Sequence, residues 1–371
     1  MDLTKFDESV YEAPYVVKDG CLYEITIVKQ QVVPVKLADF VPLLTAEVTY
    51  DDGTEQKKLF RVSAVHKSGA IMPEVIVSAE EMQSMKWMLN RWGKLGSAQP
   101  KHNTLSKICH AIMSTLKEIR FETVYQQTGW KKINGEYVFL MPKMQNNFTV
   151  ELQGKLKKYS FTSCLPHDVN FLSAMLENSF VPQRVMLPML ALTFLCPLNH
   201  FLKIGGYEPK FVTALIGRTG SRKSTLAALF LSFFGKFNSV ELPMSFHDTA
   251  NSILANIYYL KDVLTCIDDF HPSGMFNEQS MKETAQNISR YYGDRIGRAR
   301  LNTKAELMPN KPPTGNALIT AEYVPELSVS GNARYFNIEL NGNDIVLDKL
   351  SEYQKLASAG VLSGIMQMYT E

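Results

Sequence analysis

One stretch of the chain decides its fold: Phe211-Val-Thr-Ala-Leu-Ile-Gly-Arg-Thr-Gly-Ser-Arg-Lys-Ser-Thr-Leu-Ala-Ala-Leu-Phe-Leu-Ser-Phe-Phe234. The apolar residues 211–216 predict a β-strand, residues 217–222 predict a loop, and an apolar helix is expected to begin near Lys223. Such a strand, loop and helix direct backbone N–H groups and the helix N-terminus at one point, where they bind phosphate. The stretch therefore predicts a phosphate-binding loop.

The loop matches GxxxxGK[ST] at every position but one, and this motif is typical of proteins that bind ATP with Mg²⁺. Lys223 is expected to reach the β- and γ-phosphates, and the Ser224 hydroxyl is expected to be a ligand of Mg²⁺. The residues predicted to contact the nucleotide are Gly217, Thr219, Gly220, Ser221, Arg222, Lys223, Ser224 and Thr225.

Arg222 departs from this motif, because it stands where the last glycine is usual. Only small residues fit inside the phosphate cradle, so the Arg222 side chain is expected to point outward, toward nucleotide phosphate or a neighbouring subunit. The alternative interpretation of the whole stretch is an unrelated Gly-Ser turn before a core helix. The agreement of strand, loop and helix signals argues against that alternative.

Two adjacent carboxylates end a second apolar strand, in the segment Asp262-Val-Leu-Thr-Cys-Ile-Asp-Asp-Phe-His271. We expect Asp268 to serve the metal and Asp269 to orient or polarise the attacking water. Asp269 has a shorter reach than the glutamate that is commoner at this position. Two aspartates at a strand end are often only a solvated turn, but their place downstream of the phosphate loop favours the catalytic interpretation.

Two more strands are predicted at residues 316–320 and 335–340. Thr320 ends the first of them, where polar groups commonly sense the γ-phosphate. Arg334 precedes the second, and we expect it to reach the nucleotide of a neighbouring subunit and to stabilise transition-state charge there. A strand-end salt bridge is the alternative role of Arg334.

A local basic segment, residues 290–304, lies between the carboxylate strand and the Thr320 strand. Its glycines and tyrosines suit a hairpin or loop that meets a phosphate backbone. The residues expected to bind DNA are Arg295, Arg298, Arg300 and Lys304. A solvated basic loop or an inter-subunit contact is the alternative.

Composition restricts the class of protein. The 371 residues include 39 Lys+Arg and 37 Asp+Glu, so the chain is not a generally basic nucleic-acid binder. Five scattered cysteines predict neither a zinc site nor a disulfide framework. The N-terminus has no signal pattern, and the most apolar stretch, residues 185–198, is expected to be a buried helix. We therefore expect a cytoplasmic protein without a membrane segment.

Two domains are expected. Residues 1–150 predict a smaller, strand-rich α+β domain with two helices, one starting at the capping pattern Ser78-Ala-Glu-Glu and one near residues 105–118. Residues 151–371 alternate helix and strand patterns, which indicates a parallel α/β sheet with helices on both faces and a short C-terminal helical segment.

The ordered set of motifs resembles the helicase-like AAA+ ATPase domain of bacterial mobile elements and phages, related to self-loading, MCM-like replicative helicases. The elements that resemble it include the strand pair at Gly129-Trp130, the phosphate loop, Phe246-His-Asp-Thr249, Ile267-Asp-Asp-Phe270 and Arg334. The resemblance implies a homo-hexamer with ATP sites between subunits and single-stranded DNA in the pore. It also places Thr320 in the sensor position and Arg334 in the trans-acting position.

The function expected from these signals is an ATP-dependent DNA helicase or translocase that acts in the replication of a mobile element or phage. Primase and single-strand-binding protein are possible partners of such a motor. The alternative is an ATP-binding oligomeric switch or scaffold, regulatory or defensive, whose turnover is not coupled to DNA. A longer natural chain would also fit the short C-terminal helical segment.

Overall fold

The computed structural model describes residues 10–142, 148–162, 170–271, 275–297, 310–324 and 329–371. The chain forms two compact units. The first unit comprises Met1–Asp51 and Glu55–Val124, and the second comprises Asp52–Thr54 and Tyr125–Glu371. Residues 125–150, which the sequence assigned to the first domain, therefore belong to the second unit.

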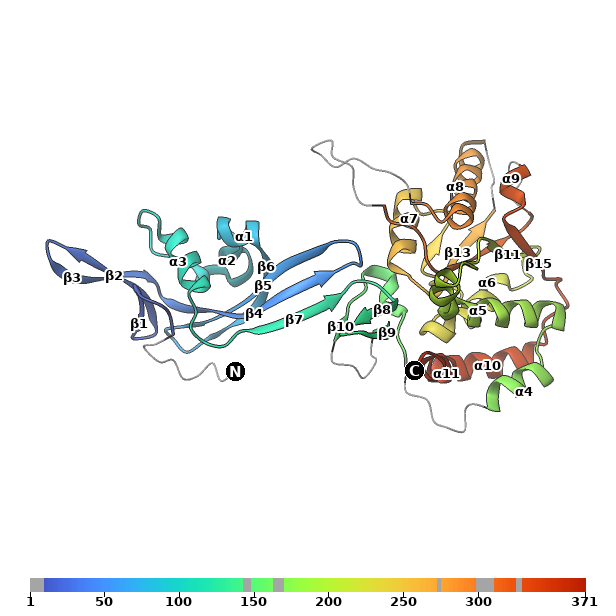
Figure 1. Ribbon diagram of the computed structural model, residues 1–371, viewed down its shortest axis with the longest axis horizontal. Coiled ribbons are helices and arrows are strands. Elements are labelled where there is room, and N and C mark those ends of the chain that lie inside the picture. The colour runs from blue at the N-terminus through green and yellow to red at the C-terminus, as the bar shows by residue number, and fades with distance from the viewer. Residues whose placement is uncertain (1–9, 143–147, 163–169, 272–274, 298–309, 325–328) are drawn as a thin grey trace. The chain divides into compact units, whose positions relative to one another are not determined.

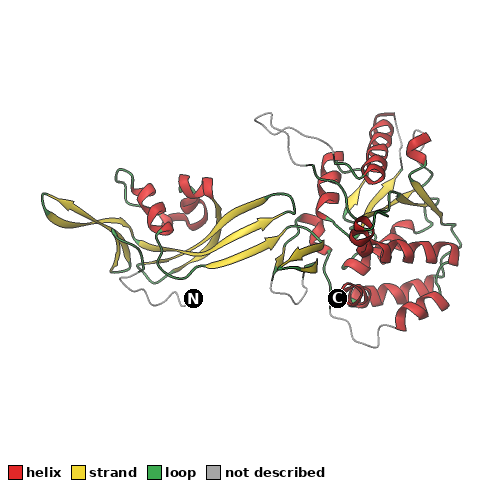
Figure 2. Ribbon diagram, in the orientation of Figure 1, coloured by secondary structure: helices red, strands yellow, loops and turns green. Residues whose placement is uncertain are grey.

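The first unit consists mainly of antiparallel strands (Figures 1 and 2). One sheet has the order β1-β2-β3, and a second contains β7, β4, β5 and β6 side by side. The strands are β1 (Tyr15–Lys18), β2 (Cys21–Val28), β3 (Gln31–Ala38), β4 (Phe40–Asp51), β5 (Gln56–His66), β6 (Ile71–Ser78) and β7 (Arg120–Tyr125). The helices are α1 (Ala79–Ser84), α2 (Trp87–Trp92), the 3₁₀ turn η1 (Gly93–Gly96) and α3 (Thr104–Met113).

The helix predicted at Ser78 begins there. The Ser78 hydroxyl accepts the N–H of Glu81 at 3.1 Å, and the Glu81 carboxylate accepts the N–H of Ser78 at 2.9 Å, which completes a capping box. This helix is short, because Met85 adopts φ +53° and this left-handed residue separates α1 from α2.

The second unit is built on a parallel sheet of order β12-β13-β14-β11-β15. Its strands are β12 (Met244–Ser245), β13 (Leu264–Phe270), β14 (Asn316–Ala321), β11 (Val212–Ile216) and β15 (Tyr335–Glu339). The edge strand next to β13 is β12. Because all five strands run in one direction, their carboxyl ends meet at one edge of the sheet.

Helices cover this sheet on both faces, as expected. Leu264 and Asn316 are paired in the register of β13 and β14, and Asn316 Nδ2 lies 3.6 Å from Cys196 Sγ of α5 (Gln183–Ile204). The next residue of β13, Thr265, points to the opposite face. There its hydroxyl lies 2.8 Å from that of Tyr292 on α8 (Met275–Asp294).

The remaining elements of this unit surround the sheet and lie before and after it. They are the hairpin β8 (Gly129–Ile133) and β9 (Glu136–Leu140), β10 (Thr149–Val150), η2 (Gly154–Lys158), α4 (Phe171–Glu177), α6 (Lys223–Leu231), η4 (Ser232–Phe234), α7 (Ala250–Tyr259), α9 (Val329–Asn332), α10 (Leu347–Ala359) and α11 (Val361–Thr370). The single C-terminal helical segment predicted from the sequence is thus two helices. They are separated at Gly360, which has φ +86°.

The apolar stretch predicted as a buried helix lies within α5, which is longer than expected, at 22 residues. Among the described residues, α5 alone is long and apolar enough to cross a membrane, and half of its apolar stretch is buried inside the unit. It contains Pro188 and Pro197, and it packs with α6 against the sheet. Burial against the sheet is what the sequence predicted for this segment.

The hairpin β8–β9 explains why the boundary lies before residue 125. Trp130 Nε1 donates to the carbonyl oxygen of Pro197 on α5 at 2.7 Å, and its ring meets Phe201 edge-on at a centroid distance of 5.2 Å. The backbone N–H of Trp130 donates to Asp262 Oδ2 at 3.0 Å. These contacts join the hairpin to α5 and to the residues that precede β13.

Asp262 gives a pH-dependent stability that can be tested. Burial raises the pKa of this carboxyl group to about 7, although the hydrogen bond from the Trp130 N–H lowers it. Since the native pKa lies above the value of about 3.9 in an unfolded chain, the native state binds the extra proton. The stability that Asp262 contributes to the native state is therefore fully present below about pH 4 and is lost as the pH rises through about 7.

We therefore expect Asp262→Asn to become more stable relative to the wild type as the pH rises from 4 to 8, by up to about 4 kcal/mol. Urea unfolding at several pH values measures this difference, with Asp348→Asn, at an exposed aspartate, as the matched control. A difference between Asp262→Asn and the wild type that does not change with pH would contradict the assignment.

Candidate nucleotide-binding site

The loop between β11 and α6 is shaped by its two glycines. A Cβ at Gly217 would lie 2.4 Å from the carbonyl oxygen of Leu340 and 2.6 Å from Ser221 Oγ, so no larger residue fits. Gly220 adopts φ +84°, which side chains rarely permit. The loop ends at Lys223, the first residue of α6, whose N-terminus faces the loop's concave side.

Arg222 also adopts a left-handed conformation, with φ +65° and ψ 32°. This conformation is the physical reason why glycine is usual at this position of the motif. The Arg222 side chain is exposed, as the sequence predicted. Ser221 differs from the expectation, because its side chain is buried under the loop and does not line the cavity described below.

Asp268 joins the three segments that the sequence singled out. Ser224 Oγ, on the first turn of α6, donates to Asp268 Oδ1 at 2.8 Å. Thr320 Oγ1, from the neighbouring strand β14, donates to the same oxygen at 2.5 Å. Hydroxyl and carboxylate oxygens are the ligand types that Mg²⁺ prefers, so this donor set fits the predicted metal.

Asp269 lies next to this cluster with its side chain largely exposed. Its backbone N–H donates to Thr320 Oγ1 at 2.9 Å, and its carboxylate oxygen Oδ2 lies 3.2 Å from His247 Nε2. Asp269 adopts φ +65°, which turns the chain at the end of β13. Thr320 thus contacts both aspartates, through its hydroxyl hydrogen and its hydroxyl oxygen.

Glu322 was not among the predicted site residues, although it lies two residues after Thr320. Its carboxylate accepts a hydrogen bond from the Thr219 hydroxyl of the loop, and Oε2 lies 2.7 Å from His271 Nδ1. The hydrogen bond from Thr219 lowers the pKa of Glu322, and the charge of His271 acts in the same direction. The signal in the sequence was a second polar side chain at the end of a central strand.

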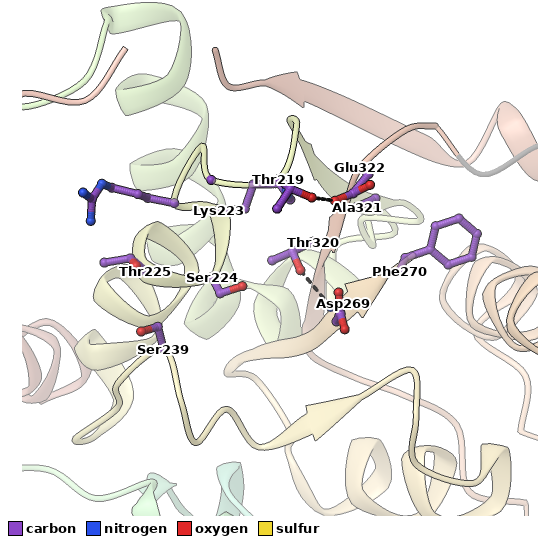
Figure 3. Close-up of a pocket in the computed structure, with 12 residues that line it drawn as sticks. Thr219, Lys223, Ser224, Thr225, Ser239, Asp269, Phe270, Thr320, Ala321 and Glu322 are labelled. Atoms are coloured by element: carbon purple, nitrogen blue, oxygen red, sulfur yellow. Dashed lines mark hydrogen bonds between the residues drawn. The ribbon is translucent and has the colours of Figure 1, made fainter. Parts of the chain in front are cut away.

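These side chains surround a cavity of about 560 Å³ at the carboxyl edge of the sheet (Figure 3). Its lining consists of Thr219, Gly220, Arg222, Lys223, Ser224, Thr225, Ser239, Asp269, Phe270, Thr320, Ala321 and Glu322. Lys223 Nζ lies beside it and donates to the carbonyl oxygens of Gly217 at 2.6 Å and Arg218 at 3.1 Å. The cavity has the size of a small-molecule site, with a cation at one wall and carboxylates at the other.

Arg334 lies at the other end of the sheet, directly before β15, and does not line this cavity. Its guanidinium group donates to Asp294 Oδ1 at 2.6 Å. Within one chain, Arg334 therefore makes the salt bridge that was the alternative expectation. A contact with nucleotide would have to be made with a neighbouring subunit.

Arg295 was predicted to bind DNA, but the structure buries its side chain. Its side chain is 4% exposed and donates to the carbonyl oxygens of Pro209 at 3.0 Å, Gly315 at 2.8 Å and Pro313 at 3.3 Å. A guanidinium group bound in this way holds the segments before β11 and β14 together and does not face solvent. Arg298, Arg300 and Lys304 lie outside the described residues.

Comparisons with known proteins show the fold. No family model matches the sequence, and no curated protein matches it significantly. The chain is similar to a solved structure described as an active helicase, Cch of SCCmec type IV, with a TM-score of 0.53 and 14% identity over 96% of this chain. The chain spans 64% of that structure's length. At this identity, the likeness shows that the chain shares a helicase-like α/β fold.

Two weaker likenesses add nothing to this conclusion. The apo C-terminal region of NrS-1 gives a TM-score of 0.34 and 11% identity, over 86% of this chain and 64% of that one. The JCV helicase gives a TM-score of 0.29 and 20% identity, over 54% of this chain and 58% of that one.

The structural role of Arg295 can be tested against the DNA-binding role. Arg295→Met leaves three buried carbonyl oxygens without their donor, so we expect a loss of about 3 kcal/mol in the free energy of unfolding. Arg290→Met, the same change at an exposed arginine of α8, is the control and should change stability by less than about 0.5 kcal/mol. Unchanged stability of Arg295→Met together with weakened DNA binding would restore the original prediction.

Proposed function

We propose that the chain is the ATP-driven motor of a DNA helicase or translocase of the AAA+ class, which acts in the replication of a mobile element or phage in the cytoplasm. One observation carries the proposal: the hydroxyls of Ser224 and Thr320 both donate to Asp268 Oδ1, beside the phosphate loop. This arrangement brings a metal site, a phosphate site and a γ-phosphate sensor together at one sheet edge. The shared fold with a helicase supports the choice of motor.

Each side chain has a distinct role in ATP hydrolysis. Ser224 and Asp268 would hold Mg²⁺, which neutralises phosphate charge when bound. Lys223 leaves the carbonyl oxygens of the loop and binds the β- and γ-phosphates. Asp269 positions the attacking water and accepts its proton, and Thr320 holds the Asp269 backbone at the correct place by accepting its N–H.

The complete motor is a homo-hexamer in this proposal, with an ATP site at each subunit contact. Arg334 then leaves Asp294 and stabilises transition-state charge in the neighbouring subunit's site. Arg298, Arg300 and Lys304 face the pore and bind the backbone of single-stranded DNA. Primase and single-strand-binding protein are the partners expected at a replication fork.

The first test is ATP turnover with and without single-stranded DNA. We expect DNA to raise turnover several-fold. Asp269→Asn should lower turnover about 100-fold while ATP still binds, because it removes the general base and leaves the phosphate site intact. Asp348→Asn serves again as the control. ATP binding with turnover that DNA does not change would favour the alternative of an oligomeric switch or scaffold.

The second test separates the two roles of Arg334. Arg334→Ala should lower turnover about 1,000-fold, because it removes the residue that acts in trans. Asp294→Asn removes the salt bridge within the chain but keeps the arginine, so it should leave turnover near the wild-type value. Equal losses in the two variants would show that Arg334 acts only through its salt bridge with Asp294.

A further inference from the structure

A second cavity, of about 320 Å³, lies in the same unit as the nucleotide site but at the opposite edge of the sheet. Its lining includes Asp262, which comes just before β13, and Thr314, which comes just before β14. Both residues therefore lie at the amino ends of the strands, whereas the phosphate loop follows the carboxyl end of β11. The function proposed above uses none of the residues in this second cavity.

Three buried polar atoms in the lining have no hydrogen-bond partner among the residues that the structure describes: Asn199 Oδ1, His200 Nε2 and Thr314 Oγ1. Asn199 is only 2% exposed. Its Nδ2 donates to the carbonyl oxygen of Thr314 at 3.3 Å, so the amide cannot be turned around without bringing two oxygens together. The oxygen of Asn199 must therefore remain the unsatisfied atom.

Such a concentration of unsatisfied groups indicates a ligand. A buried polar atom left without a partner destabilises the folded state, and these three line one cavity. Its volume is at the lower end of the range of small-molecule sites. Asp262 adds a carboxyl group to the lining, and burial raises the pKa of this group.

The chemistry of the lining defines the ligand. Asn199 Oδ1 can only accept a hydrogen bond, and the Asp262 carboxylate accepts as well, so the ligand must carry N–H or O–H donors. Two lysines, Lys203 and Lys261, and two carboxyl groups, Glu208 and Asp262, line the cavity, so the lining suits a ligand without net charge. Trp130 also lines the cavity, and an aromatic residue there suits a flat heterocycle.

We propose that this cavity binds a nucleobase that carries an exocyclic amine, either as a free nucleoside or as a base turned out of a DNA strand. Adenine and cytosine carry an exocyclic amine with two N–H donors, one for each of the acceptors on Asn199 and Asp262, whereas thymine has only its single N3–H. The surface of the same unit provides further contacts for a nucleotide chain, because Phe201 and Tyr137 are 41% and 45% exposed and Lys132 Nζ lies 5.8 Å from the centre of the Tyr137 ring. Only the strand form of the ligand rests on the function proposed above.

The test measures base preference with the first site filled by a non-hydrolysable ATP analogue. Fluorescence anisotropy compares twelve-nucleotide strands of dA, dC and dT, and calorimetry compares adenosine with thymidine. We expect the amine-bearing ligands to bind about tenfold more tightly than thymine. Asn199→Leu and the shape-conserving Thr314→Val should abolish this preference, while Asn337→Leu, at an exposed asparagine, should retain it.

Each outcome has a defined meaning. A preference for adenosine over thymidine supports a nucleoside site, and a preference seen only with strands supports capture of a DNA base. Equal binding of all bases overturns the proposal, even where strands bind tightly and the translocase function stands. If Asn199→Leu and Thr314→Val leave every base preference unchanged, the base does not bind in this cavity and the proposal is overturned.

Discussion

The proposed nucleotide site depends on one oxygen atom, Asp268 Oδ1, on which the hydroxyls of Ser224 and Thr320 converge. The three residues come from a helix and two strands that are adjacent only because β13, β14 and β11 pair in parallel register. A shift of one residue in β13 or β14 would turn the side chain concerned to the opposite face of the sheet. The register of the sheet therefore determines whether these three side chains meet.

The two edges of the parallel sheet differ in the exposure of their polar side chains. At the carboxyl edge, polar side chains surround an open cavity, and hydrogen bonds link the phosphate loop to the ends of β13 and β14. At the amino edge, ionisable groups are buried: Arg295 binds three carbonyl oxygens, and Asp262 accepts the N–H of Trp130. Buried polar groups of this kind require hydrogen-bond partners, so the amino edge is held by specific hydrogen bonds.

Some side chains outside the predicted set of site residues also contact residues of the site. Glu322 bonds to Thr219 of the loop and to His271 after β13, and His247 lies beside Asp269. These contacts place an imidazole group beside each of the carboxylates of Asp269 and Glu322. Lys223 donates hydrogen bonds to two backbone carbonyl oxygens of the loop, so a phosphate group bound by Lys223 would have to replace these contacts.

The sequence by itself determined the strand, loop and helix around Lys223, the carboxylates after β13 and the polar end of β14, because each is encoded by neighbouring residues. The tertiary structure decided the roles of Arg295, Glu322 and Asp262. In the sequence, Arg295 belongs to a local basic segment. Its hydrogen-bond acceptors, however, are carbonyl oxygens 86, 18 and 20 residues away along the chain. Burial and partners of this kind depend on how distant segments pack, and no local pattern of residues encodes that packing.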